Sequence, residues 1–183
     1  MRGVELPIIC LDEQVRIDPD PGGSELALLG QYLDYQRETI LSKTDGLTRV
    51  QLAQQHAPSE LTLAGLLYHL SLVEEDWLEV RFSGLPDREP WAGVDWKADP
   101  NWEFRTARDL EPDTLQSRYR DACERSRHIV SGAAGLDQLS VQALRDGRHF
   151  SLRWVLLHLI EETARHAGHA DFLREAIDGK IGE

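Results

Sequence analysis

The sequence predicts an all-α protein, a four-helix bundle with a long loop between its second and third helices. Apolar residues recur every three or four positions over several long segments, which is the spacing of a buried helix face. Helix-starting and helix-ending residues bound these segments, and only short stretches could form strands. The 183 residues suit one domain that is large enough to enclose a hydrophobic core.

Helix boundaries follow from capping residues and chain breakers. Residues 1–23 read as an irregular arm rich in proline and glycine at its end, which leaves 24–183 for the bundle domain. Ser24 is suited to cap a first helix that stops near Asp45, and a short helix fits 49–55. A second long helix starts near Glu60 and closes at Gly84. The third fits 112–134 and the fourth fits 151–177.

The predicted loop, residues 84–111, has neither helical nor strand periodicity. It contains Pro86, Pro90 and Pro100, and it also carries Trp91, Trp96 and Trp102. A loop of this length in a compact domain is functional or disordered. Because three tryptophans argue against disorder, we expect a packed flap.

Composition excludes several classes of partner. A net charge of −12 disfavours nucleic acid and anionic membranes, since binding phosphates requires clustered Lys and Arg. No apolar run approaches the roughly 20 residues of a membrane helix. The two cysteines, Cys10 and Cys123, form no framework of disulfides, which is typical of reduced thiols in the cytoplasm. We therefore expect a cytoplasmic protein that acts on a small molecule.

The last helix carries the residues that predict chemistry. Positions 158, 162, 166 and 169 fall on one stripe, where three imidazoles and a carboxylate replace the expected apolar residues. Burying such groups is costly unless they are paired or bind a metal. Glu162 and His166 lie one turn apart, and His69 lies on the apolar face of the second helix. These three residues are the predicted ligands of a divalent cation, zinc first, with nickel or iron as alternatives.

Other interpretations of these side chains stay open. Glu162 could simply pair with Arg165, and an isolated inward histidine is often a hydrogen-bonded core residue. His158 is expected to support a ligand or to pack in the core, and His169 to orient a ligand or contact substrate. If the site is catalytic, His158 and His169 are the candidates for moving a proton near neutral pH.

Two segments resemble the DinB-like superfamily. Leu61-Thr-Leu-Ala-Gly-Leu-Leu-Tyr-His69-Leu is similar to its second helix, and Arg153 through His158 to Asp171 is similar to the branch named after a mini-circle protein. The resemblance implies a four-helix bundle, often a homodimer, with a divalent metal on His69, Glu162 and His166. Most relatives have histidine at the position of Glu162, but the mycothiol-dependent maleylpyruvate isomerase has glutamate there. That isomerase has an additional C-terminal domain, so its activity is not implied.

Three functions are compatible with this site. The first is a metal-dependent S-transferase that joins a low-molecular-weight thiol, such as mycothiol or bacillithiol, to a small electrophile held under the tryptophan-bearing loop. The second is metal-assisted hydrolysis with Glu161 or His169 as base, which the lack of a clear second buried carboxylate weakens. The third is a non-catalytic, metal-stabilised bundle with a role in stress response. We favour the first.

Overall fold

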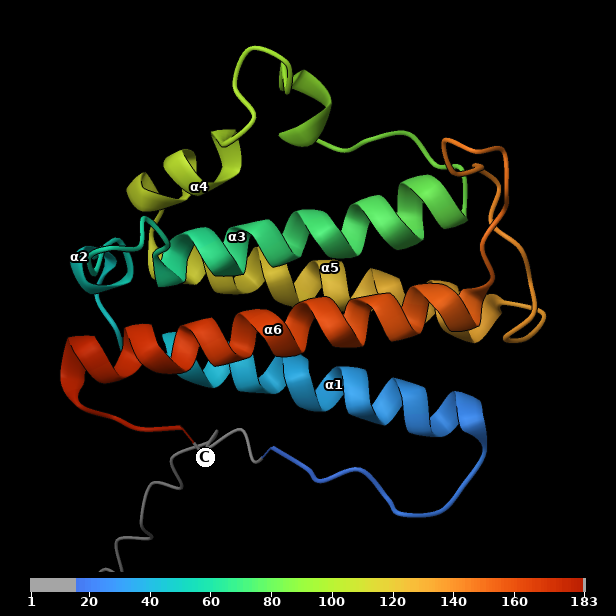
Figure 1. The fold of residues 1–183 in the computed structure, drawn as a ribbon, viewed down its shortest axis with the longest axis horizontal. Helices are drawn as coiled ribbons and strands as arrows, with labels where there is room; N and C mark the ends of the chain where they lie inside the picture. Colours follow the sequence, from blue (N-terminus) through green and yellow to red (C-terminus); the bar gives the residue numbers. More distant parts are fainter. Residues whose placement is uncertain (1–15, 183) are drawn as a thin grey trace, which may run out of the picture.

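Four long helices lie side by side in the structure, a computed structural model that describes residues 16–182 (Figure 1). They are α1 (Glu25–Thr44), α3 (Leu63–Glu74) with its π-helical continuation η1 (Glu75–Phe82), α5 (Pro112–Gly132) and α6 (Leu152–Asp178). The shorter elements are α2 (Arg49–Leu52), η2 (Trp91–Gly93), α4 (Trp102–Thr106) and η3 (Ala107–Asp109). The predicted all-α class is confirmed: within residues 16–182 the only extended pairing is an isolated bridge between Leu139 and Ser151.

Local capping explains where the long helices begin. The hydroxyl oxygens of Ser24 and Ser151 accept hydrogen bonds from the first turns of α1 and α6, and α5 begins at Pro112, all as predicted. The second helix begins at Leu63 instead of near Glu60, because Thr62 is its cap and accepts a 3.0 Å hydrogen bond from the backbone N–H of Gly65. Most of the predicted arm, residues 1–15, lies outside the described residues; residues 16–23 have no helix or strand.

The helices pair closely as α1 with α6 and α3 with α5. Two apolar clusters fill the space between them. One surrounds α3, the N-terminal half of α5 and the C-terminal half of α6, and its fully buried members include Leu66, Leu67 and Leu115. The other lies where η1 meets the start of α6, around Leu78, Leu152 and Val155.

The predicted second helix changes its hydrogen-bonding pattern at Glu75 and continues as a π-helix to Phe82. The wider π turn presents two buried carboxylates to one arginine of α5. Arg125 Nη2 lies 2.9 Å from Glu75 Oε1, and Arg125 Nε lies 2.6 Å from Glu79 Oε1. The continuation of α3 is therefore held to α5 by ion pairs as well as by apolar contacts.

A buried ion pair joins α1 to α3. Arg37 binds Glu74 through two parallel hydrogen bonds of 2.7 and 2.6 Å, and their side chains are only 3% and 2% exposed. The Arg37 guanidinium also contacts Asp34, which in turn binds Arg127 of α5. Cys123 lies beside the pair, and burial raises the pKa of its thiol, which keeps the thiol protonated and unreactive.

The segment 84–111 packs onto α3 and contains the short elements η2, α4 and η3, which its sequence did not predict. Trp91 is 3% exposed and donates a 3.1 Å hydrogen bond from Nε1 to Glu75. The rings of Trp91, Trp96 and Trp102 contact one another, and Tyr68 of α3 contacts two of them. The expected packed flap therefore exists, with its tryptophans forming a cluster of their own.

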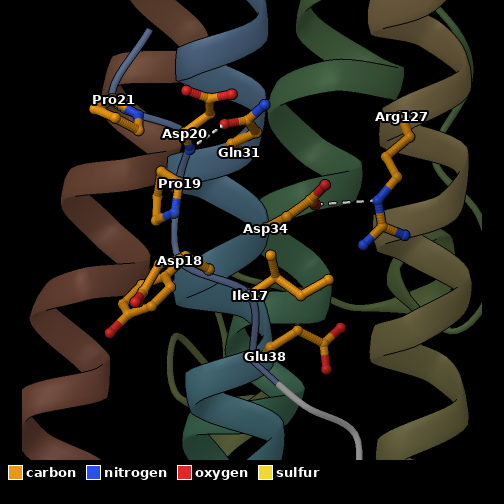
Figure 2. A pocket seen from close by; sticks show the side chains of 10 residues that line it. Ile17, Asp18, Pro19, Asp20, Pro21, Gln31, Asp34, Glu38 and Arg127 are labelled. Atoms are coloured by element: carbon orange, nitrogen blue, oxygen red, sulfur yellow. Dashed lines mark hydrogen bonds and ion pairs between the residues drawn. The ribbon is translucent and has the colours of Figure 1, made fainter.

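A pocket of about 860 Å³ lies between residues 17–21, α1 and Arg127 of α5 (Figure 2). Its lining is acidic, with Asp18 and Asp20 from the segment 17–21 and Glu38 and Asp34 from α1, where Asp34 forms the 3.0 Å ion pair with Arg127. None of the predicted metal ligands lines it. The pocket is thus separate from the stripe on α6.

The Arg37–Glu74 pair gives a test of the fold. Removing one partner leaves a buried charge without compensation, so Arg37→Met or Glu74→Met is expected to lower the free energy of unfolding by about 3–5 kcal/mol. The double variant Arg37→Met/Glu74→Met is expected to lose less than either single one. Urea unfolding measures all three, with the exposed Arg148→Met as the control that changes little. Additive losses in the double variant would contradict this account.

Candidate metal centre

The three predicted ligands come together between α3 and α6. His69 Nε2 lies 3.5 Å from Glu162 Oε1, and His166 Nε2 lies 3.3 Å from the same oxygen. One donor atom from each residue can be chosen so that all three lie within 4.8 Å of one another. Two of the ligands lie one helical turn apart on α6, and the third comes from the facing helix, as the two stripes predicted.

The spacing of these atoms fits a tetrahedral cation. Two ligand atoms at about 2.0–2.1 Å from a tetrahedral ion lie roughly 3.4 Å apart. The two nitrogen–oxygen separations meet this condition, since His69 Nε2 and His166 Nε2 lie 3.5 and 3.3 Å from Glu162 Oε1. Three protein ligands leave a fourth position for an exogenous molecule. An open position of this kind is found in catalytic zinc sites, whereas structural sites are closed by four protein ligands.

The ionisation of these side chains suits metal binding. Burial alone would raise the pKa of Glu162, but His166 and His69 lower it, and the net pKa lies below the usual value. Burial and the charge of His69 lower the pKa of His166, and Glu162 only partly opposes this shift. At neutral pH the site therefore offers a carboxylate and a neutral imidazole, the forms that bind a cation.

The second nitrogen of each imidazole also has a partner. His69 Nδ1 lies 3.3 Å from Glu103 Oε1, and His166 Nδ1 lies 3.3 Å from His169 Nδ1. Because the Glu103 carboxylate can only accept, its contact favours a proton on Nδ1 of His69, which leaves the Nε2 lone pair of that ring free for a metal. In the contact between His166 and His169 either Nδ1 can be the donor. His169 is exposed and lies at the outer edge of the site. The structure thus places His169 where it can orient His166.

The site is open to solvent on one side. The side chains of His69 and Glu162 are 20% and 21% exposed, and that of His166 is 12% exposed. Arg165 binds Glu161 and not Glu162, so the interpretation of Glu162 as the partner of Arg165 is wrong. Glu162 faces the two imidazoles instead. Solvent therefore reaches a carboxylate and two imidazoles.

His158 lies one turn before Glu162 but contacts aromatic residues. Its ring is 4.5 Å from that of Trp77 and stacks on that of Trp154 at 5.3 Å, measured between ring centroids. The structure thus does not bring His158 into the group of three ligands. Its role in moving a proton stays a prediction, as does that of His169.

Glu103 is the residue of this site that sequence reasoning missed. It belongs to α4, in the segment that was expected to lack periodic structure, and its side chain is 7% exposed. Glutamate is common on surfaces, and nothing in the neighbouring letters Trp102-Glu103-Phe104 marks it as buried. Only the packing of α4 on α3 brings it to His69.

Comparisons with known proteins agree with this picture. The family model described as mycothiol-S-transferase matches residues 28–179, a range that contains all three ligands and Glu103. No curated protein matches the chain. In fold, the chain is similar to the crystal structure of a conserved protein from Enterococcus faecalis, with a TM-score of 0.61 and 17% identity, over 87% of this chain and 100% of that one.

The family match covers most of the chain and every element of the candidate site. The match agrees with the DinB-like superfamily that the sequence resembles, whereas the narrower resemblance to the mini-circle branch stays a prediction. Helix order, the converging ligands and the matched range lead to one assignment. The chain belongs to the mycothiol S-transferase family.

Proposed function

We propose that this protein is a metal-dependent S-transferase that joins a low-molecular-weight thiol, of the mycothiol or bacillithiol type, to a small electrophile in the cytoplasm. The family match supports the transfer of a thiol. Dependence on a metal is supported by the convergence of His69, Glu162 and His166, whose donor atoms lie within 4.8 Å of one another. Zinc is the first candidate for the cation, because a mixed set of imidazole and carboxylate ligands suits it.

The side chains of the site have two roles in this proposal: some would hold the cation, and one would receive a proton. His69, Glu162 and His166 would hold the cation and leave one side of it open. Bound there, a divalent cation would lower the pKa of a thiol that it contacts and so supply the nucleophilic thiolate. His169, beside His166 and exposed, would accept the thiol proton and release it to solvent. The thiol sulfur then forms a bond to the electrophilic carbon as the leaving group departs with its electron pair.

Hydrolysis is less well supported by this arrangement. It requires a base beside the open side of the cation to activate a water molecule. The buried carboxylate of Glu103 contacts Nδ1 of His69, on the opposite edge of the ring from Nε2. Glu161 binds Arg165. Neither carboxylate therefore lies where it could act as this base, which leaves His169 as the candidate base for either reaction. The family match favours a thiol over water as the nucleophile.

Metal uptake tests the first part of the proposal. Single changes His69→Ala, Glu162→Ala and His166→Ala are each expected to weaken zinc binding by more than about 100-fold, since even groups that only orient ligands contribute about 10–100-fold. Competition with a chromophoric chelator gives the affinity, and elemental analysis of protein without a polyhistidine tag gives the stoichiometry.

The control for metal uptake is His128→Ala, because His128 is an exposed histidine of α5 away from the site. Its affinity for zinc is expected to equal that of the unmodified protein. Zinc binding that survives all three ligand changes would show that the cation binds elsewhere.

Thiol dependence tests the second part. The zinc-loaded protein is expected to accelerate the conjugation of mycothiol or bacillithiol with chlorodinitrobenzene, in which the thiol sulfur bonds to the ring carbon and chloride ion leaves. A chelator or Glu162→Gln should abolish this acceleration. Absorbance of the aryl thioether follows the reaction, and glutathione serves as the comparison thiol.

Two results would argue against transfer of a thiol. Turnover of a nitrophenyl ester without any thiol, lost in Glu162→Gln, would favour hydrolysis. A metal that raises Tm but supports neither reaction with any thiol tested would favour the non-catalytic bundle.

A further inference from the structure

The geometry points to Glu103 as a positioning residue of the metal centre, one that reaches His69 from the segment between α3 and α5. This inference rests on the proposed metal site and adds a residue to it. Among the contacts of the described residues, no lysine or arginine neutralises the carboxylate of Glu103. Glu103 Oε1 lies 3.3 Å from His69 Nδ1, while Oε2 is buried without a hydrogen-bond partner.

The burial of Glu103 calls for a compensating positive charge. The residue is 5% exposed, and a carboxylate removed from water is costly unless a cation or several hydrogen bonds replace the lost solvent. Its single polar contact is one edge of the His69 ring, and the opposite edge of that ring faces Glu162. A divalent cation bound at that opposite edge would be balanced in charge by the two carboxylates together. Glu103 is thus placed to complete a carboxylate–imidazole–metal arrangement.

The residue after Glu103 holds the face of the same ring. Phe104 stacks on His69 with ring centroids 4.9 Å apart and an angle of 22° between the planes. Gly65, one turn before His69 on α3, makes room for it, because a Cβ at Gly65 would lie 3.0 Å from Phe104 Cδ1. Two consecutive residues of α4 therefore fix the edge and the face of one ligand.

The rest of α4 is anchored beside this ligand. Trp102 contacts Tyr68, the residue before His69, with ring centroids 6.2 Å apart. Trp102 also contacts the buried Trp91 at 6.1 Å. The tryptophans of the flap thus hold α4 on α3, and α4 in turn holds His69. Glu103 links the packing of the flap to the affinity of the metal site.

The variant that tests the inference is Glu103→Gln. A glutamine amide is a weaker acceptor than a carboxylate, and it can rotate to donate to Nδ1 and so place the imidazole proton on Nε2, the atom that must bind the metal. The affinity for Zn²⁺, measured in the full chain by competition with a chromophoric chelator, is expected to fall about 10–100-fold. The absorption spectrum of bound Co²⁺ is expected to change as well, which a purely structural role of Glu103 would not cause.

A matched control is Asp99→Asn. Asp99 lies in the same segment and pairs with Arg105 of α4, so this variant removes a carboxylate that contacts α4 without touching His69. Its Zn²⁺ affinity is expected to match that of the unmodified protein. Tm of the metal-free proteins shows whether each variant folds.

A measurement on the unmodified protein does not depend on how Glu103→Gln folds. In the Zn²⁺-loaded chain, nitrogen-15 NMR is expected to show a slowly exchanging, downfield-shifted Nδ1–H of His69, assigned by its loss in His69→Gln. A rapidly exchanging Nδ1–H, or a folded Glu103→Gln variant with unchanged Zn²⁺ affinity, would overturn the inference and leave the proposed function standing. Failure of the unmodified protein to bind either Zn²⁺ or Co²⁺ would overturn both.

Discussion

The register of α3 against α6 is the constraint on which the candidate site depends. His69 comes from α3 and the other two ligands from α6, yet the closely packed helix pairs are α1 with α6 and α3 with α5. Helices α3 and α6 also contact each other directly, and α1 adds polar contacts to both of them that help to hold the register. Arg37 of α1 binds Glu74, five residues beyond His69 on α3, and Arg174 of α6 donates hydrogen bonds to the carbonyl oxygens of Lys43 and Asp45 at the end of α1. Because these contacts are directional and largely buried, a shift of either helix that separated the ligands would also cost these hydrogen bonds.

Much of this arrangement is encoded in local sequence. Caps such as Ser24 and Ser151 and the proline at 112 specify where the helices start, and the period of apolar residues specifies which faces turn inward. The ligands were predictable for the same reason: imidazole and carboxylate groups stood where the period required apolar residues. Two inward stripes must face each other in a small bundle, so His69 and Glu162 were expected to meet.

What the sequence did not reveal depends on tertiary contacts. The π-helical continuation of α3 has no sequence pattern of its own, because the partners of Glu75 and Glu79 come from distant segments. These partners are Arg125 of α5 and, in the flap, Arg88 and Trp91. The same holds for Glu103, whose burial follows from the packing of Trp102 and Phe104 on α3. These residues lie in elements of three to eight residues, which are too short for a hydrophobic period to identify.

The flap of residues 84–111 has a structural role beside the one first expected. Its tryptophans were interpreted as a cover for an electrophile, but Trp91 is buried against Tyr68 and all three rings contact one another. The buried ring of Trp91 is not free to stack on a ligand, whereas Trp96 and Trp102 are only half-buried, so a cover for an electrophile stays a prediction. Their position nevertheless influences the site, since they anchor α4, and α4 contacts His69 through both Glu103 and Phe104. Packing thus allows a segment without a regular period to influence a metal ligand. A substitution at Trp91 would move α4 and so displace the imidazole of His69, although Trp91 is not itself one of the three ligands.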